Sequence, residues 1–137
     1  MIKGLNHIGI VVENIDQTVQ TLESIFGAKE LDRKSFPELG QTSCMVQLGN
    51  CLLELMEPIG TKGVVPKFLA DHGQGLHHIS LLSDNVQQEH LAITAKGVRM
   101  LGDPDSELRV VFTHPKDTNG IIYEITDIPF QAEGSST

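Results

Sequence analysis

Two stretches of the chain share one pattern of polar and hydrophobic positions. Residues 5–12 read LNHIGIVV and residues 75–82 read GLHHISLL, so that a histidine, His7 or His78, opens an apolar run in each. Runs rich in β-branched residues with period-two alternation are typical of strands. The two histidines stand 71 positions apart, and repetition of this kind predicts a duplicated module.

A helix is predicted after each of these strands. Asn14 and Asn85 occupy N-cap positions, and Gly27 and Gly97 stand where a glycine would end the helix. In the first copy, apolar residues recur at helical spacing between the two caps: Ile15, Val19, Leu22 and Phe26.

Three strands are expected after each helix. In the first copy, residues 28–36 are extended, and residues 42–48 and 51–56 form a hairpin around Gly49-Asn50, a typical two-residue turn. The corresponding strands of the second copy are residues 98–101, 108–113 and 121–126. The order strand, helix and three strands, with the helix on one outer face, predicts an α+β fold.

The length of 137 residues suits one domain, or two half-domains that share a core. We expect a single domain with module one at about residues 4–60 and module two at about residues 75–128. A connecting helix at about 64–73 would join them, and residues 129–137 would form a frayed tail.

Each module also contains a glutamate inside an apolar strand. Glu54 lies in the sequence LEL, and Glu124 lies 70 positions later in the sequence YEI. A buried carboxylate requires a partner. Strand parity turns these glutamates and both histidines away from the helices, so we expect His7, Glu54, His78 and Glu124 to converge on one cleft.

Imidazole and carboxylate ligands together suit a first-row divalent ion. Such an ion, acting as a Lewis acid, lowers the pKa of a C–H bond beside a carbonyl, and a nearby carboxylate can move the proton. The alternative for each residue alone is a satisfied polar side chain on a half-exposed sheet, but the paired spacings favour a four-ligand site. Parity points His77 away from the cleft, as a structural residue.

The composition limits the classes of partner and the cellular location that we expect for this protein. A net charge of −8 argues against nucleic acid, and no apolar run reaches the length of a membrane helix. The first residues do not resemble a signal peptide, so the expected location is the cytoplasm. In the predicted hairpin register, Cys44 and Cys51 lie too far apart for a disulfide, and both are expected to be reduced.

Four stretches resemble the vicinal oxygen chelate superfamily, which includes the glyoxalases, and within it the methylmalonyl-CoA epimerases. They are residues 5–12, 53–58, 67–79, and 112–116 leading to 120–124. The third stretch is the most specific, because other branches of the superfamily seldom carry a connecting helix that runs into GLHH.

The resemblance implies two βαβββ modules that form one metal-binding cleft, commonly in a homodimer. It implies His7, His78 and Glu124 as metal ligands, with Glu54 at the remaining position, and cobalt as the ion, or nickel, manganese or zinc. The implied reaction interconverts the epimers of methylmalonyl-CoA or a similar acyl-CoA by enolate-type transfer of the α-proton, with Glu124 as a catalytic residue.

Two features depart from the family pattern. The position that carries a glutamate base in some epimerases resembles Ser43 here, which leaves the second base unassigned. The segment 101–109 is shorter than the family loop before the last hairpin. Lys116, in the sequence HPK, is either a contact for a CoA phosphate or a solvated loop lysine.

The same superfamily includes proteins with other functions, whose requirements can be compared with these residues. A glyoxalase I-like lyase or isomerase acting on a thiol adduct would use the same metal chemistry. A ring-cleaving dioxygenase needs iron with open positions, which Glu54 would crowd. A metal-free resistance protein of the bleomycin-binding kind has lost the metal ligands and uses aromatic residues, whereas this chain keeps all four ligands and has no Trp and one Tyr.

Overall fold

The computed structural model describes residues 1–130, so residues 131–137 of the predicted tail lie outside the described residues. Within residues 1–130 the elements are β1 (Ile2–Val11), α1 (Ile15–Phe26), β2 (Lys29–Phe36), the 3₁₀ turn η1 (Pro37–Leu39), β3 (Gln41–Leu48), β4 (Cys51–Pro58), α2 (Val64–His72), β5 (Gly75–Ser83), α3 (Val86–Ala95), β6 (Met100–Leu101), β7 (Val110–Thr113), the 3₁₀ turn η2 (Pro115–Asp117) and β8 (Tyr123–Thr126). The α+β class and the repeated order of strand, helix and three strands are confirmed.

Both modules pair their strands in the same way. The hydrogen-bonded order is β2-β3-β4-β1 in the first and β6-β7-β8-β5 in the second. Three consecutive strands are antiparallel, whereas the first strand of each module runs parallel to the last. Parallel neighbours need a crossover connection, and the helix that follows each first strand begins it.

The β3–β4 hairpin has the register that its turn sequence predicts. Leu48 pairs with Cys51 across the turn, and Glu54 pairs with Met45. Both cysteines are free, as predicted. Cys44 is fully buried, and its burial raises the pKa of the thiol to about 11, so it stays protonated and serves as a packing residue.

The described chain divides into two compact units, residues 1–7 with 78–130 and residues 8–77. Each of β1 and β5 contributes one end to each unit. The units therefore differ from the two sequence modules, because both leading strands are divided between them.

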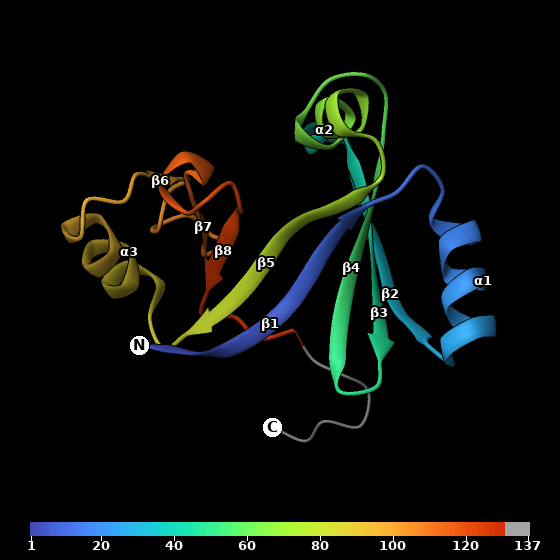
Figure 1. Cartoon of the computed structure of the whole chain (residues 1–137), viewed down its shortest axis with the longest axis horizontal. Coiled ribbons are helices and arrows are strands. Elements are labelled where there is room, and N and C mark those ends of the chain that lie inside the picture. The colour runs from blue at the N-terminus through green and yellow to red at the C-terminus, as the bar shows by residue number, and fades with distance from the viewer. Residues whose placement is uncertain (131–137) are drawn as a thin grey trace. The chain divides into compact units, whose positions relative to one another are not determined.

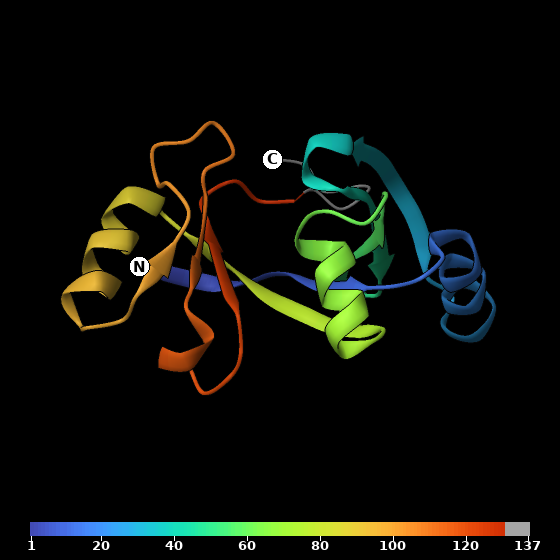
Figure 2. The same cartoon turned by 90° about the horizontal axis from the view of Figure 1, so that it is seen from above.

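In the unit of residues 8–77, two helices cover opposite faces of the strands (Figure 2). The residues that parity predicts pack against α1: Ile8 and Ile10 of β1, and Val12 directly after it. On the other face, Val11 and Met56 are buried beneath α2. Val11 and Met56 thus belong to a second small core on the face opposite α1. The period-two pattern alone did not indicate this core.

In the unit of residues 1–7 and 78–130, α3 packs on β6, β7 and β8 (Figure 1). Its core consists of Val86, Val111 and Ile125, with Leu81, Ile93 and Met100 packed against them. No helix in the described part of the chain is long and apolar enough to cross a membrane.

Asparagine side chains begin the two long helices, as predicted. The Oδ1 of Asn14 accepts the backbone N–H of Gln17 at 2.9 Å, and the Oδ1 of Asn85 accepts that of Gln88 at 2.9 Å. These bonds satisfy helix donors that have no partner within the helix.

Each module also has a carboxylate that accepts a backbone N–H at the start of its helix. This bond connects the helix to the end of the module's last strand. Glu57 accepts the N–H of Ile15 at 2.9 Å, and Asp127 accepts the N–H of Val86 at 2.9 Å. Each carboxylate stands three positions after the strand glutamate of its module. A carboxylate at a helix N-terminus is also favoured by the helix dipole.

Asp127 carries a further interaction, because the guanidinium of Arg109 donates to both of its oxygens, from Nε to Oδ1 at 2.6 Å and from Nη2 to Oδ2. The Arg109 hydrogen bonds hold the pKa of the Asp127 carboxyl below its usual value, against the opposing effect of burial. Arg109 itself adopts a left-handed backbone conformation, with φ 52°, which a non-glycine residue keeps only where its surroundings hold it.

We expect Asp127→Asn to lower the free energy of unfolding by about 1–2 kcal/mol at pH 7, because the charge-assisted bonds to Arg109 are lost. The folded-state pKa of Asp127 is depressed, so its contribution is present above the unfolded pKa of about 4 and disappears as the pH falls through the folded pKa. Urea unfolding of both proteins between pH 7 and pH 2 should therefore show the gap closing in acid.

The matched control is Glu57→Gln, which keeps an acceptor for the Ile15 N–H and should stay within about 0.5 kcal/mol of the wild type. A gap between Asp127→Asn and wild type that is the same at every pH would contradict the role assigned to the ion pair.

Candidate metal centre

Three neighbouring strands, β1, β5 and β8, bring together His7, His78 and Glu124. The two imidazole Nε2 atoms lie 3.1 Å apart. Glu124 reaches both rings, with Oε2 at 3.3 Å from His7 Nε2 and Oε1 at 3.8 Å from His78 Nε2. All three residues belong to the unit of residues 1–7 and 78–130.

These three side chains are among the most deeply buried polar groups of the described residues. Their exposed fractions are 1% for His7, 3% for His78 and 7% for Glu124. Aromatic rings lie next to both imidazoles, with the ring of Phe130 centred 4.3 Å from that of His7 and the ring of Phe112 centred 6.2 Å from that of His78. An apolar setting of this kind strengthens electrostatic interactions within the cluster.

The donor set fits a divalent cation. Two ligands bound at about 2.1 Å to one ion stand about 3.0 Å apart at right angles and about 3.4 Å apart at the tetrahedral angle. The separations of 3.1 and 3.3 Å match these values, and all the candidate ligand atoms lie within 4.8 Å of one another. Two imidazoles and one carboxylate suit a borderline first-row metal ion.

Glu54, the other ligand expected from the sequence, lies half-buried on β4 in the unit of residues 8–77. It pairs with Gly9 of β1, as Glu124 pairs with Ser80 of β5. Gly9 and Ser80 each stand two positions after the module's histidine. Glu54 therefore holds in its module the register position that Glu124 holds in the other, and its participation in the centre remains a proposal.

Ser43 and His77 both contact neighbouring side chains. Ser43 is 7% exposed on β3 and accepts a hydrogen bond from the side-chain amide of Gln41 at 2.9 Å. His77 makes an edge contact with Phe68 of α2, with ring centroids 5.0 Å apart. The packing role predicted for His77 agrees with this contact.

Lys116 lies exposed in η2, a turn that neighbouring residues hold in place. His114 Nδ1 accepts its backbone N–H at 3.1 Å. Arg99 donates to both oxygens of Asp117, from Nε at 2.9 Å and from Nη2 at 3.0 Å. These bonds hold the pKa of the Asp117 carboxyl well below its usual range. Lys116 thus projects from a fixed turn.

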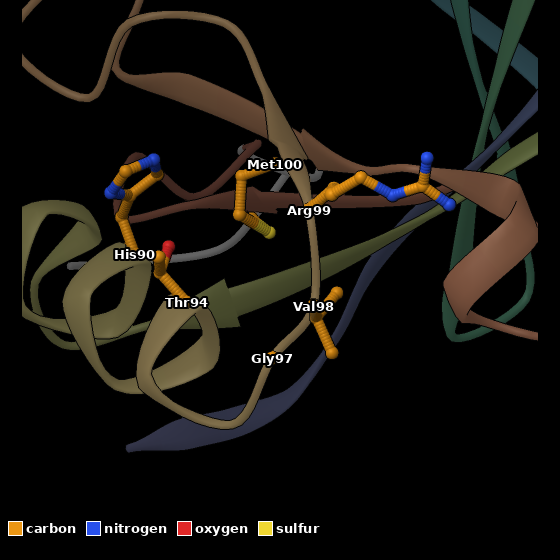
Figure 3. A pocket seen from close by; sticks show the side chains of 6 residues that line it. All are labelled: His90, Thr94, Gly97, Val98, Arg99 and Met100. Carbon is orange, nitrogen blue, oxygen red and sulfur yellow. The ribbon is translucent and has the colours of Figure 1, made fainter.

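A shallow hollow of about 370 Å³ lies elsewhere in the same unit, beside α3. Its lining consists of His90, Thr94, Gly97, Val98, Arg99 and Met100. Figure 3 shows the guanidinium of Arg99 directed away from the other lining residues, in keeping with its bonds to Asp117. The hollow therefore brings no set of converging catalytic groups together.

Two residues near the centre had not been singled out from the sequence. Asn6 precedes His7, and its side-chain amide reaches His7 Nδ1 and the hydroxyl of Ser80. Phe130 lies beyond the last strand, and its ring packs against that of His7 at an inclined angle. Asn6 was visible only as part of the repeated stretch, and the sequence around Phe130 carries no signal that links it to a histidine more than a hundred residues earlier.

The sequence and the fold are similar to those of known proteins. Residues 6–112 match the model of the Glyoxalase/Bleomycin resistance protein/Dioxygenase superfamily. Methylmalonyl-CoA epimerase, mitochondrial, of Dictyostelium discoideum is 32% identical over 129 residues, which cover 90% of this chain and 77% of that protein. Ethylmalonyl-CoA/methylmalonyl-CoA epimerase of Cereibacter sphaeroides is 28% identical, covering 93% of this chain and all of that protein.

Solved structures agree with this relationship. The methylmalonyl-CoA epimerase of Streptomyces coelicolor, in complex with 2-nitronate-propionyl-CoA, superposes with a TM-score of 0.82 and 30% identity. The match covers 91% of this chain and 96% of that one. The relatives are isomerases by name, so the prediction of an isomerase-type enzyme is confirmed at the level of the family. The chain belongs to the glyoxalase, or vicinal oxygen chelate, superfamily, and its relatives there include methylmalonyl-CoA epimerases.

Proposed function

We propose that this protein is a divalent-metal-dependent epimerase of methylmalonyl-CoA or a similar acyl-CoA. The observation that carries the proposal is the buried cluster of His7, His78 and Glu124, whose donor atoms have the spacing of ligands on one ion. Relatives named for methylmalonyl-CoA, and one also for ethylmalonyl-CoA, support the substrate class.

In this proposal His7, His78 and Glu124 hold the ion, and Glu54 is a fourth ligand. When bound, the ion supplies Lewis acidity that lowers the pKa of a C–H bond beside a carbonyl. Cobalt is the proposed ion, with nickel, manganese and zinc as alternatives, because imidazole and carboxylate ligands accommodate all of them.

Glu124 is the residue that we assign to proton transfer. Its carboxylate lies among the other two ligands, with Oε2 at 3.3 Å from His7 and Oε1 more loosely placed at 3.8 Å from His78. A carboxylate that is within reach of the α-carbon can take up the proton on one face of the substrate. Epimerisation also requires a proton donor at the opposite face, and Ser43, buried on β3, is unsuited to that role because its hydroxyl is a weak acid.

A single domain, a homodimer and a cytoplasmic location complete the proposal. The single domain rests on the duplicated sequence pattern, and the homodimer rests on the family resemblance. Size-exclusion chromatography with light scattering would measure the number of chains in the assembly.

The reaction can be tested by isotope exchange. We expect cobalt-loaded protein in deuterium oxide to place deuterium at the α-carbon of methylmalonyl-CoA, measured by mass spectrometry, whereas metal-free protein should not. Glu124→Gln should slow this exchange by about 100-fold or more, because it removes a metal ligand and the proposed base.

Glu57→Gln is the matched control for Glu124→Gln, since it alters a β4 carboxylate that caps α1, and it should exchange at the wild-type rate. Exchange by metal-free protein at the full rate would contradict metal dependence. An absence of exchange in cobalt-loaded wild type would contradict the substrate assignment.

Glu54 can be tested independently of activity. We expect Glu54→Ala to weaken Co²⁺ binding by about 10–100-fold, as loss of one ligand or its support does in other metal sites. Calorimetric titration of the metal-free protein measures this change. Glu30→Ala, which alters a carboxylate paired with Arg33 on β2, should leave the affinity unchanged. Equal affinities for wild type and Glu54→Ala would remove Glu54 from the ligand set.

Lys116 can be tested through the Michaelis constant. If its ammonium contacts a CoA phosphate, Lys116→Ala should raise the KM for the CoA thioester about fivefold, as expected for an exposed ion pair worth up to about 1 kcal/mol. The KM for a thioester without phosphates should not change. Lys34→Ala, on β2, is the control lysine, and a KM unchanged by Lys116→Ala would identify a solvated loop residue.

A further inference from the structure

The amide side chain of Asn6 connects three segments around the metal centre. Its Nδ2 lies 3.4 Å from His7 Nδ1 and 3.5 Å from the hydroxyl of Ser80. Its Oδ1 accepts the backbone N–H of Phe130 at 3.1 Å. Ser80 is fully buried on β5 and pairs with Glu124 of β8. All of these residues lie in the unit of residues 1–7 and 78–130.

Phe130 fixes the orientation of this amide. A backbone N–H can only donate, so the atom of Asn6 that faces it is the carbonyl oxygen. The amide nitrogen is then turned toward His7 Nδ1, which accepts from it at 3.4 Å. A neutral imidazole at His7 that accepts this bond at Nδ1 carries its proton on Nε2, the atom that faces His78 and Glu124.

Metal coordination by His7 Nε2 requires the opposite tautomer. The coordinating nitrogen must present a lone pair, so the proton moves to Nδ1. Metal-bound histidines almost always donate that second N–H to an oxygen, which fixes the ring and raises its basicity. Asn6 can supply the oxygen by turning its amide through 180°, but Oδ1 is then directed away from the Phe130 N–H.

We propose that Asn6 is a positioning residue for the metal ligand His7, and that the backbone N–H of Phe130 competes with His7 for the Asn6 carbonyl oxygen. Phe130 lies directly against the same imidazole, with ring centroids 4.3 Å apart and planes inclined by 45°. Metal binding at His7 is thereby linked to the docking of the segment after β8. This inference rests on the proposed metal function.

The test uses the metal-free full-length protein and Co²⁺ as the probe. Calorimetry measures the dissociation constant, and the visible absorption of bound Co²⁺ reports the ligand set. We expect Asn6→Ala to raise the dissociation constant by about 10–100-fold and to shift the cobalt bands toward those of His7→Ala. Asn6→Asp should bind at least as tightly as wild type, because a carboxylate can accept from His7 and Phe130 at the same time.

Phe130 provides a second pair of variants that leaves Asn6 and the strands intact. Phe130→Ala removes the ring and keeps the N–H, whereas Phe130→Pro also removes the N–H. We expect the proline variant to bind Co²⁺ about three- to tenfold more tightly than the alanine variant, because the competing donor is gone. The control is Thr42→Ala, which removes the contact between the hydroxyls of Thr42 on β3 and Ser35 on β2. It should match wild type in the dissociation constant and in the cobalt spectrum.

The outcomes separate this inference from the function on which it rests. Wild-type protein that takes up no Co²⁺ would overturn the metal centre and the inference together. Tight wild-type binding with an unchanged constant and spectrum in Asn6→Ala would overturn the positioning role alone. Equal or weaker binding by Phe130→Pro than by Phe130→Ala would overturn the competition. Where Asn6→Ala does not fold, the two Phe130 variants and Asn6→Asp still decide the question.

Discussion

The burial of two imidazoles and a carboxylate in one small space is the constraint on which the site depends. His7, His78 and Glu124 are nearly inaccessible to water, and polar groups in such a position destabilise a protein unless they satisfy one another. Here each lies within 4 Å of another member of the group. An arrangement that satisfies these groups mutually also leaves their donor atoms at the spacing that one cation requires.

Duplication explains how so small a chain assembles this site. Each module supplies one histidine on its first strand and one glutamate on its last, and the parallel pairing of these two strands sets the histidine and the glutamate in the same relative register. A carboxylate three positions after the glutamate then anchors the module's helix. In each module, the last strand therefore carries a glutamate in this register, and the carboxylate that anchors the helix follows three positions later.

The two modules share the same order and pairing of strands, but the residues that pack around these strands differ. In the first, α2 buries Val11 and Met56 on the face of the strands that lies away from α1. In the second, Phe112 lies next to His78, and Arg109 reinforces the helix anchor at Asp127. Phe130, which follows this module, lies next to His7. The second module and the residues directly after it thus supply these aromatic neighbours of the cluster, together with two of its three residues.

The sequence by itself determined the elements and the candidate ligands, because these depend on local periodicity and on matched spacing. The asparagine caps, the hairpin register around Gly49-Asn50 and the paired positions of His7 and His78 all followed from residues close to one another or from the repeat. The tertiary structure alone decided the parallel pairing within each module and the partners of Asn6, because these contacts join segments far apart in the chain. A histidine's neighbours in space are set by packing, which periodicity does not encode.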